Sequence, residues 1–131
     1  MQIFPNGTRP SRKGPADSFT GDVTIDPIVG QDIGAGMMAL SVRFAPGART
    51  FWHTHDKGQV LHVTQGVGWI GKRGEAAQEI RAGDTVWIPA GVEHWHGAGP
   101  DMAMTHMAMQ SVDPGTETRW MEEVDASDYG V

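Results

Sequence analysis

The chain has 131 residues, a formal net charge of -6 and no cysteine. That length is enough for one domain, which would bury roughly two-thirds of the surface of the unfolded chain. The absence of cysteine excludes disulfides, thiolate metal ligands and cysteine nucleophiles, and it suits a reducing compartment. The 10 Lys and Arg residues are scattered among 16 acidic residues, so the basic patch that nucleic-acid binding requires is missing.

Apolar residues occur only in short runs. None approaches the ~18 residues of a membrane-spanning helix, and the first residues lack the basic-then-apolar pattern of a secretory signal. We therefore expect a cytoplasmic protein without a membrane partner. With 18 glycines and 8 prolines between the short apolar runs, the composition favours an all-β, turn-rich fold over a helical one.

The first 18 residues form a polar N-terminal arm with three prolines, and two interpretations of it stay open. The arm is either flexible or, because Gln2–Phe4 is short but strand-like, an edge strand that is exchanged at an oligomer interface. Residues 19–131 are then the barrel domain with its C-terminal tail.

Alternating side chains predict the first strands of this domain. Phe19–Ile25 alternates and is expected to end at the Asp-Pro pair that follows it. Met38–Phe44 alternates more clearly. If Arg43 faces solvent, Leu40 and Val42 face the interior.

The next predicted strand, Arg49–His55, carries two histidines one residue apart. Because the side-chain period of a strand is two, His53 and His55 point to the same face. Gln59 follows after a turn and begins another strand, Gln59–Thr64. Two imidazoles on one strand face, with a third donor from the next strand, make half of a metal site.

The later strands are short and separated by glycine, proline and charged turns. Thr85–Ile88 is expected to be buried, and the Pro-Ala-Gly turn after it presents His94 to the same site. The strand period also places His62 on the outer face, away from the site. The other predicted elements are Val67–Gly71, Ala77–Ile80, the alternating segment Asp101–Ser111, and a C-terminal helical turn capped by Asp125 or Ser127.

Two motifs in the chain resemble those of the cupin superfamily, G-x5-H-x-H-x3,4-E-x6-G and G-x5-P-x-G-x2-H-x3-N. Every spacing fits, and two positions depart from the pattern, with Gln59 in place of Glu and Ala98 in place of Asn. The resemblance implies an all-β, single-domain cupin fold, also described as a double-stranded β-helix or jelly-roll barrel. The matching residues are Gly47, His53, His55, Gln59 and Gly66 in the first motif, and Gly83, Pro89, Gly91 and His94 in the second.

Three imidazoles and one amide oxygen form the predicted metal-ligand set, which comprises His53, His55, Gln59 and His94. Neutral nitrogen and oxygen ligands suit Mn2+, Fe2+, Co2+, Ni2+ or Zn2+, whereas the lack of thiolate argues against a closed structural zinc site. Because Gln59 is neutral, the full charge of a cation would stay on the site. This favours Lewis-acid chemistry over oxygen activation.

Two further histidines, His96 and His106, are expected beside the metal site. Each is either a general acid–base group, since histidine titrates near neutrality, or a hydrogen-bond partner or satisfied core residue. Apolar residues around them predict a pocket for a small substrate, aromatic ones included, although any one of these residues could equally be plain core. The expected pocket residues are Leu40, Val42, Trp52 and Met104, with Trp87 and Trp95 close by.

Longer segments are similar to the manganese-dependent hydroxynitrile lyases, a group of small bacterial cupins related to the carboxymuconolactone decarboxylases. The segments include GARTFWHTHDKGQ, VWIPAGVEHWHGA and AMTHMAMQ, and the similarity covers nearly the whole chain. It implies bound Mn2+, a homodimer or homotetramer, and reversible cleavage of an (R)-cyanohydrin such as mandelonitrile into an aldehyde and HCN. It also implies that His96 and His106 move the proton and bind cyanide, that Gln110 orients it, and that Leu40 and Val42 shape the aldehyde pocket.

Two other functions stay open from the sequence. One is a cupin dioxygenase, or an isomerase or decarboxylase-related enzyme, that acts on a small aromatic or ring-cleavage compound. Oxygen consumption by an iron-loaded sample would favour the dioxygenase. The other is a metal-dependent small-molecule binding module, which a ligand would stabilise without turnover.

Overall fold

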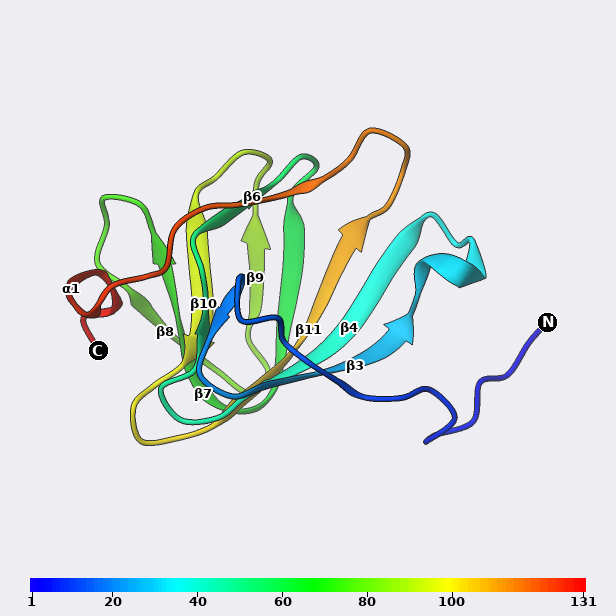
Figure 1. The fold of residues 1–131 in the computed structure, drawn as a ribbon, viewed down its shortest axis with the longest axis horizontal. Coiled ribbons are helices and arrows are strands. Elements are labelled where there is room, and N and C mark those ends of the chain that lie inside the picture. The colour runs from blue at the N-terminus through cyan, green and yellow to red at the C-terminus, as the bar shows by residue number, and fades with distance from the viewer.

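A computed structural model describes all residues, 1–131, and almost every regular element in it is a strand (Figure 1). This confirms the all-β prediction. In chain order the elements are β1 (Arg12–Lys13), β2 (Phe19–Thr20), β3 (Val23–Val29), the 3-10 turn η1 (Gln31–Ile33), β4 (Met37–Phe44), β5 (Arg49–Thr50), β6 (His53–His55), β7 (Gln59–Lys72), β8 (Gln78–Arg81), β9 (Thr85–Ile88), β10 (His94–Ala98), β11 (Met104–Ser111), β12 (Thr118–Trp120) and the helix α1 (Ala126–Tyr129).

Two antiparallel sheets share the long strand β7 and curl around one interior (Figure 1). The first half of β7 pairs with β11, which continues through β4 to β3 and β1, while β9 pairs with the other edge of β7. The second half of β7 pairs with β10 and β8, and β10 continues to β5 and β6. This arrangement is a curled cupin barrel, as the two motifs imply.

The sequence predicts two strands where β7 is continuous. The glycine between them, Gly66, has a positive φ of 79°, and a side chain there would collide with the carbonyl oxygen of Ala103. Next to it the pairing with β11 shifts register at Thr105/His106, which marks a β-bulge. The chain therefore bends at Gly66 without leaving the sheet, and one strand serves both layers.

The core lies between the two sheets. Along β4, Val42 and Phe44 are buried while Arg43 is exposed, which confirms the predicted alternation. Phe44, Val63 and Met104 are fully buried in the largest apolar cluster. On the outer face, β9 differs from its prediction as a buried strand, because Trp87 is 60% exposed and only Ile88 is buried.

The predicted first strand, Phe19–Ile25, is two strands in the structure. Gly21, with a φ of 80°, separates β2 from β3, and β2 pairs with β5 in the other sheet. The Asp-Pro pair does not end β3, which continues to Val29. Beyond Ile25, only β4 pairs with β3, so Pro27 occupies an edge where its missing N–H costs no ladder hydrogen bond.

The two chain ends lie on opposite sides of the molecule (Figure 1). Residues before Arg12 form no strand and project from the barrel, whereas β1 pairs with β3 of the same chain. At the other end, the side chain of Asp125 accepts a hydrogen bond from the Asp128 N–H at 2.8 Å, so Asp125 is the predicted cap of α1.

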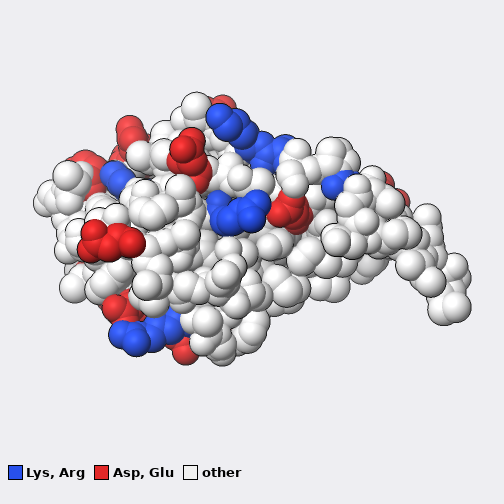
Figure 2. Space-filling view, turned by 90° about the horizontal axis from the view of Figure 1, so that it is seen from below, with Lys and Arg blue, Asp and Glu red and all other residues white.

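Charged side chains of both signs are interspersed over the face seen in Figure 2, and the projecting N-terminal tip carries none. This distribution agrees with the scattered basic residues of the sequence. Neither helical segment has the length and apolar character needed to cross a membrane.

Candidate metal centre and active-site cavity

Five histidines and one glutamine converge between the sheets. His53 and His55 come from β6, His94 and His96 from β10, and His106 from β11. Gln59 is the first residue of β7. The pairing of β6 with β10 places His94 directly opposite His53. All six side chains are at most 5% exposed, so the barrel holds an unusually polar group in its interior.

The three histidines of the predicted ligand set lie close together. The ring centroid of His53 is 4.2 Å from that of His94 and 5.0 Å from that of His55. The tightest group of ligand atoms, all within 4.8 Å of one another, consists of His53, His94 and His96. His96, which we expected only beside the metal, thus lies as close to His53 and His94 as a ligand would.

Backbone carbonyl groups fix the orientation of two of these rings. Nδ1 of His53 lies 2.9 Å from the carbonyl oxygen of Phe51, and Nδ1 of His94 lies 2.9 Å from that of Val92. A carbonyl oxygen can only accept, so each Nδ1 carries the proton and donates it. The Nε2 lone pairs of His53 and His94 are then free to bind a metal ion.

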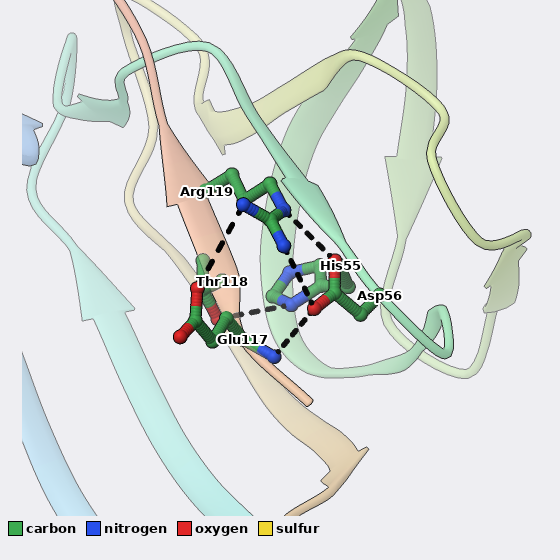
Figure 3. A network of polar contacts seen from close by, with 5 residues as sticks. All are labelled: His55, Asp56, Glu117, Thr118 and Arg119. Atoms are coloured by element: carbon green, nitrogen blue, oxygen red, sulfur yellow. Dashed lines mark hydrogen bonds and ion pairs between the residues drawn. The ribbon is translucent and has the colours of Figure 1, made fainter. Parts of the chain in front are cut away.

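A side-chain contact, rather than a backbone carbonyl group, orients His55 (Figure 3). Its Nδ1 lies 3.2 Å from Oγ1 of Thr118, which β12 places opposite it. Asp56 holds that strand on both sides of Thr118, because its carboxylate accepts the Glu117 N–H at 2.9 Å and the Arg119 Nε–H at 3.0 Å. The hydrogen bond from Arg119 is the main reason why the pKa of Asp56 is lowered.

Gln59 is oriented by its neighbour Gln110. The Gln59 Nε2–H donates to Oε1 of Gln110 at 2.9 Å, and the Gln110 Nε2–H donates to Oγ1 of Thr118 at 3.3 Å. In this network the amide nitrogen of Gln59 is hydrogen-bonded, and its amide oxygen has no hydrogen-bond partner. The oxygen is the atom that a cation would use.

The buried polar atoms fit a divalent metal ion. Three of the predicted ligand atoms have no hydrogen-bond partner in the protein: His55 Nε2, Gln59 Oε1 and His94 Nε2. Each such atom costs about 1–3 kcal/mol when it is left unpaired, and a bound cation would remove that cost. Burial lowers the pKa of His55 to about 4 and also lowers the pKa of His53 and His94, so the rings are neutral and able to coordinate.

His96 and His106 form a hydrogen-bonded pair beside this cluster. His106 Nε2 and His96 Nδ1 are 2.9 Å apart, and the outer nitrogens, His96 Nε2 and His106 Nδ1, have no partner. Burial lowers the pKa of His106 to about 4. Burial, and then the neighbouring His106, hold the pKa of His96 well below its usual value. The pair therefore shares a proton between two neutral rings.

A cavity of about 320 Å³, a size typical of small-molecule sites, opens from between the sheets onto four of the five histidines. The predicted ligand His94 does not line it. Two of the predicted pocket residues, Leu40 and Val42, line it. The predicted polar residues that line it are His53, His55, Gln59, His96, His106 and Gln110.

The structure places the other two predicted pocket residues, Trp52 and Met104, in the core. Trp52 immediately precedes His53 and belongs to a separate apolar cluster with Trp95. Met104 shares the inward face of β11 with His106, but it fills the space left by Gly68, where a side chain would collide with it. Trp87 is on the outer surface.

Sequence reasoning missed the residues at the mouth of the cavity, Arg12, Phe19 and Trp120. The Trp120 ring lies 4.5 Å from the ring of His53 and 5.7 Å from that of Phe19. β12 brings Trp120 there by pairing with β6, and β2 brings Phe19 there by pairing with β5. No local pattern signals these long-range pairings. We call these three residues the mouth.

Comparisons with known proteins agree with this architecture. Residues 36–131 match the family model of the AraC-like ligand binding domain. Over 129 residues, 98% of each chain, the protein is 50% identical to an (R)-mandelonitrile lyase of Granulicella tundricola. A solved cupin-like protein from Thermotoga maritima is 37% identical, with a TM-score of 0.85 over 98% of this chain and 95% of that one.

A more distant structure shares the fold alone. The polyketide cyclase RemF from Streptomyces resistomycificus superimposes with a TM-score of 0.72 at 16% identity, over 98% of this chain and 89% of that one. The family match covers most of the chain and includes every histidine of the cavity. The chain therefore belongs to the AraC-like ligand-binding family of cupin-fold proteins.

Proposed function

We propose that the protein is a metal-dependent hydroxynitrile lyase, which reversibly cleaves an (R)-cyanohydrin such as mandelonitrile into an aldehyde and HCN. The observation that carries this proposal is the 50% identity to an (R)-mandelonitrile lyase over 98% of both chains. The buried histidine cluster and the cavity in front of it support the proposal, because the reaction requires proton transfer in a small, enclosed site.

The reaction has a simple balance. The hydroxyl group loses its proton, the carbon–carbon bond to the nitrile breaks with its electron pair on cyanide, and cyanide takes up a proton. No electron donor, electron acceptor or oxygen is consumed. A divalent cation would supply Lewis-acid stabilisation for the developing carbonyl oxygen. Its ligands would be His53, His55, Gln59 and His94, and the resemblance to the manganese-dependent hydroxynitrile lyases favours Mn2+.

The His96–His106 pair can perform both proton transfers. In one tautomer, the His96 Nδ1–H donates to His106 Nε2, and the lone pair of His96 Nε2 is free to accept the hydroxyl proton. Burial keeps both rings neutral near pH 7, as a proton acceptor must be. The charged pair then returns a proton to cyanide, so the two rings act as one acid–base unit.

The remaining predicted residues orient the reactants. Gln110 uses one N–H and one lone pair for Thr118 and Gln59, which leaves a second N–H to donate to cyanide. Leu40 and Val42 line the apolar part of the cavity, where the aldehyde side chain would lie. Trp120 and Phe19 offer aromatic surface for a phenyl ring.

The test is benzaldehyde release from (R)-mandelonitrile by Mn2+-loaded protein under nitrogen. We expect release that requires the metal and continues without oxygen, with (R)-mandelonitrile cleaved faster than (S)-mandelonitrile. Metal-loaded protein that releases no benzaldehyde would contradict the proposal. Activity that stops when oxygen is removed would instead indicate a dioxygenase.

The family match favours one second candidate, a metal-dependent small-molecule binding module, because the matching model describes a ligand-binding domain. Such a module would be stabilised by benzaldehyde or mandelonitrile in a thermal melt while the nitrile stays intact. Measuring the melting temperature and product release in the same sample separates the two functions.

A further inference from the structure

The position of Arg12 bears on which substrates the cavity prefers. β1 pairs with β3 so that Arg12 lies directly opposite Ile25, and Lys13 lies opposite Thr24. Residues directly opposite each other in an antiparallel pair project from the same face. Ile25 is 4% exposed and lines the cavity, so Arg12 faces the cavity and Lys13 faces away from it.

Arg12 is the one Lys or Arg residue that lines the cavity, whereas the adjoining groove is lined by Arg9 and Asp32 as well. No Asp or Glu lines the cavity, although the chain has 16 acidic residues against 10 basic ones. Arg12 takes part in none of the ion pairs or side-chain hydrogen bonds of the protein. The nearby Arg9, in contrast, pairs with Asp32 at 3.5 Å.

Arg12 also lies where the cavity meets a second space. Arg12, Met38 and Leu40 line both the cavity and an adjoining open groove of about 670 Å³. A substrate whose reacting carbon lies at His96 and His106 would therefore direct its far end past the apolar wall toward the guanidinium group. The planar guanidinium presents paired N–H donors that match a carboxylate.

We infer that Arg12 is a specificity-determining residue, and that the preferred substrates are aromatic hydroxynitriles whose ring carries a carboxylate. This inference rests on the proposed function, since it places the nitrile-bearing carbon at the histidine pair. The carboxylate accepts hydrogen bonds from Arg12, and the ring lies between Leu40 and the mouth residues Phe19 and Trp120.

The experiment compares kcat/KM for 3- and 4-carboxymandelonitrile with that for mandelonitrile, in the native protein, in Arg12→Gln and in the matched control Lys13→Gln. We expect the native protein to prefer one carboxylated substrate. Arg12→Gln should reduce that preference about tenfold, through KM, and Lys13→Gln should leave it unchanged. Equal preference in the native protein and Arg12→Gln would overturn the inference.

A binding measurement separates this inference from the proposed function. The affinity of the metal-free and Mn2+-loaded protein for 3- and 4-formylbenzoate and for benzaldehyde can be followed by tryptophan fluorescence, without turnover. If nothing is cleaved but a formylbenzoate binds more tightly than benzaldehyde, and only in protein with Arg12, the lyase proposal fails and the role of Arg12 stands. A carboxylate preference that depends on the metal and survives Arg12→Gln would assign the anion to the histidine cluster and overturn the inference.

Discussion

The fold holds the deep wall and the mouth of the cavity in different ways. The deep wall consists of His53, His55, His96 and His106, which are at most 5% exposed and lie on the strands β6, β10 and β11. The mouth consists of Arg12, Phe19 and Trp120 on strands of two or three residues near the chain ends, and Trp120 is 42% exposed. Under the proposed function, proton transfer and metal binding belong to the buried wall, and substrate selection belongs to the more accessible mouth.

Removing a ring of the deep wall should have the largest effect. We expect His106→Ala to lower kcat for mandelonitrile cleavage by ~10²- to 10⁴-fold, because the proton-transfer pair is broken. The metal content per chain should stay normal, since His106 is not among the predicted ligands. His62→Ala, on the outer face, is the control. Retained activity in His106→Ala would remove His106 from the mechanism.

The deep wall should also make the metal-free protein sensitive to acid. The pKa of His106 is about 4 in the folded protein and has its ordinary value near 6.5 in the unfolded chain, so the unfolded state binds more protons between these values. The free energy of unfolding should therefore fall as the pH drops from 6.5 to 4, by about 3 kcal/mol from this residue.

Urea unfolding at several pH values between 7 and 4 measures this effect. His106→Leu, which cannot be protonated, should flatten the dependence on pH, and His62→Leu on the outer face is the matched control. Parallel curves for the native protein and His106→Leu would show that burial of this ring does not control the acid sensitivity.

Thr118 connects the two regions, since it lies on β12 with Trp120 and contacts His55 in the deep wall. Thr118→Val keeps the side-chain shape and removes the oxygen that orients His55 and Gln110. We expect Mn2+ affinity, measured by calorimetry, to fall about 10- to 100-fold. Thr54→Val, on β6 between the two ligand histidines, is the matched control. An unchanged dissociation constant in Thr118→Val would exclude this orienting role.

The smallest effect is expected at the mouth. Trp120→Ala should raise KM for mandelonitrile about 2- to 10-fold, the equivalent of a lost aromatic contact of about 0.5–1.5 kcal/mol, and change kcat little. Trp120→Phe should restore most of the loss, and Trp87→Ala on the outer surface should change neither constant. A fall in kcat at constant KM would mean that Trp120 acts through the His53 ring that it covers, rather than on the substrate.

The difference between wall and mouth also explains what the sequence could predict. His53 and His55 are two residues apart on one strand, so strand geometry alone places them on one face. The two-residue period of a strand also predicts correctly that Leu40 and Val42 of β4 face the interior. Trp120 and Phe19, from opposite ends of the chain, meet only because β12 pairs with β6 and β2 pairs with β5. Local periodicity carries no information about such pairing.

The other differences between the predicted and the observed structure occur at glycine and tryptophan residues. The sequence predicts two strands on either side of Gly66, but the freedom of φ at this glycine lets β7 bend and continue into the second sheet. Trp52 and Trp87 were expected near the pocket because large apolar side chains often line one. Trp52 lies in the core and Trp87 on the surface, and composition alone cannot distinguish these three environments.

A metal titration is the sharpest test of metal-dependent cleavage by this protein. Metal-free protein would be titrated with Mn2+ under nitrogen, while bound metal and benzaldehyde release from (R)-mandelonitrile are measured in the same samples. We expect activity to rise in proportion to occupancy and to saturate at one ion per chain, and we expect His94→Ala neither to bind metal nor to cleave the nitrile. Cleavage that is independent of occupancy, or full occupancy without cleavage, would contradict this expectation.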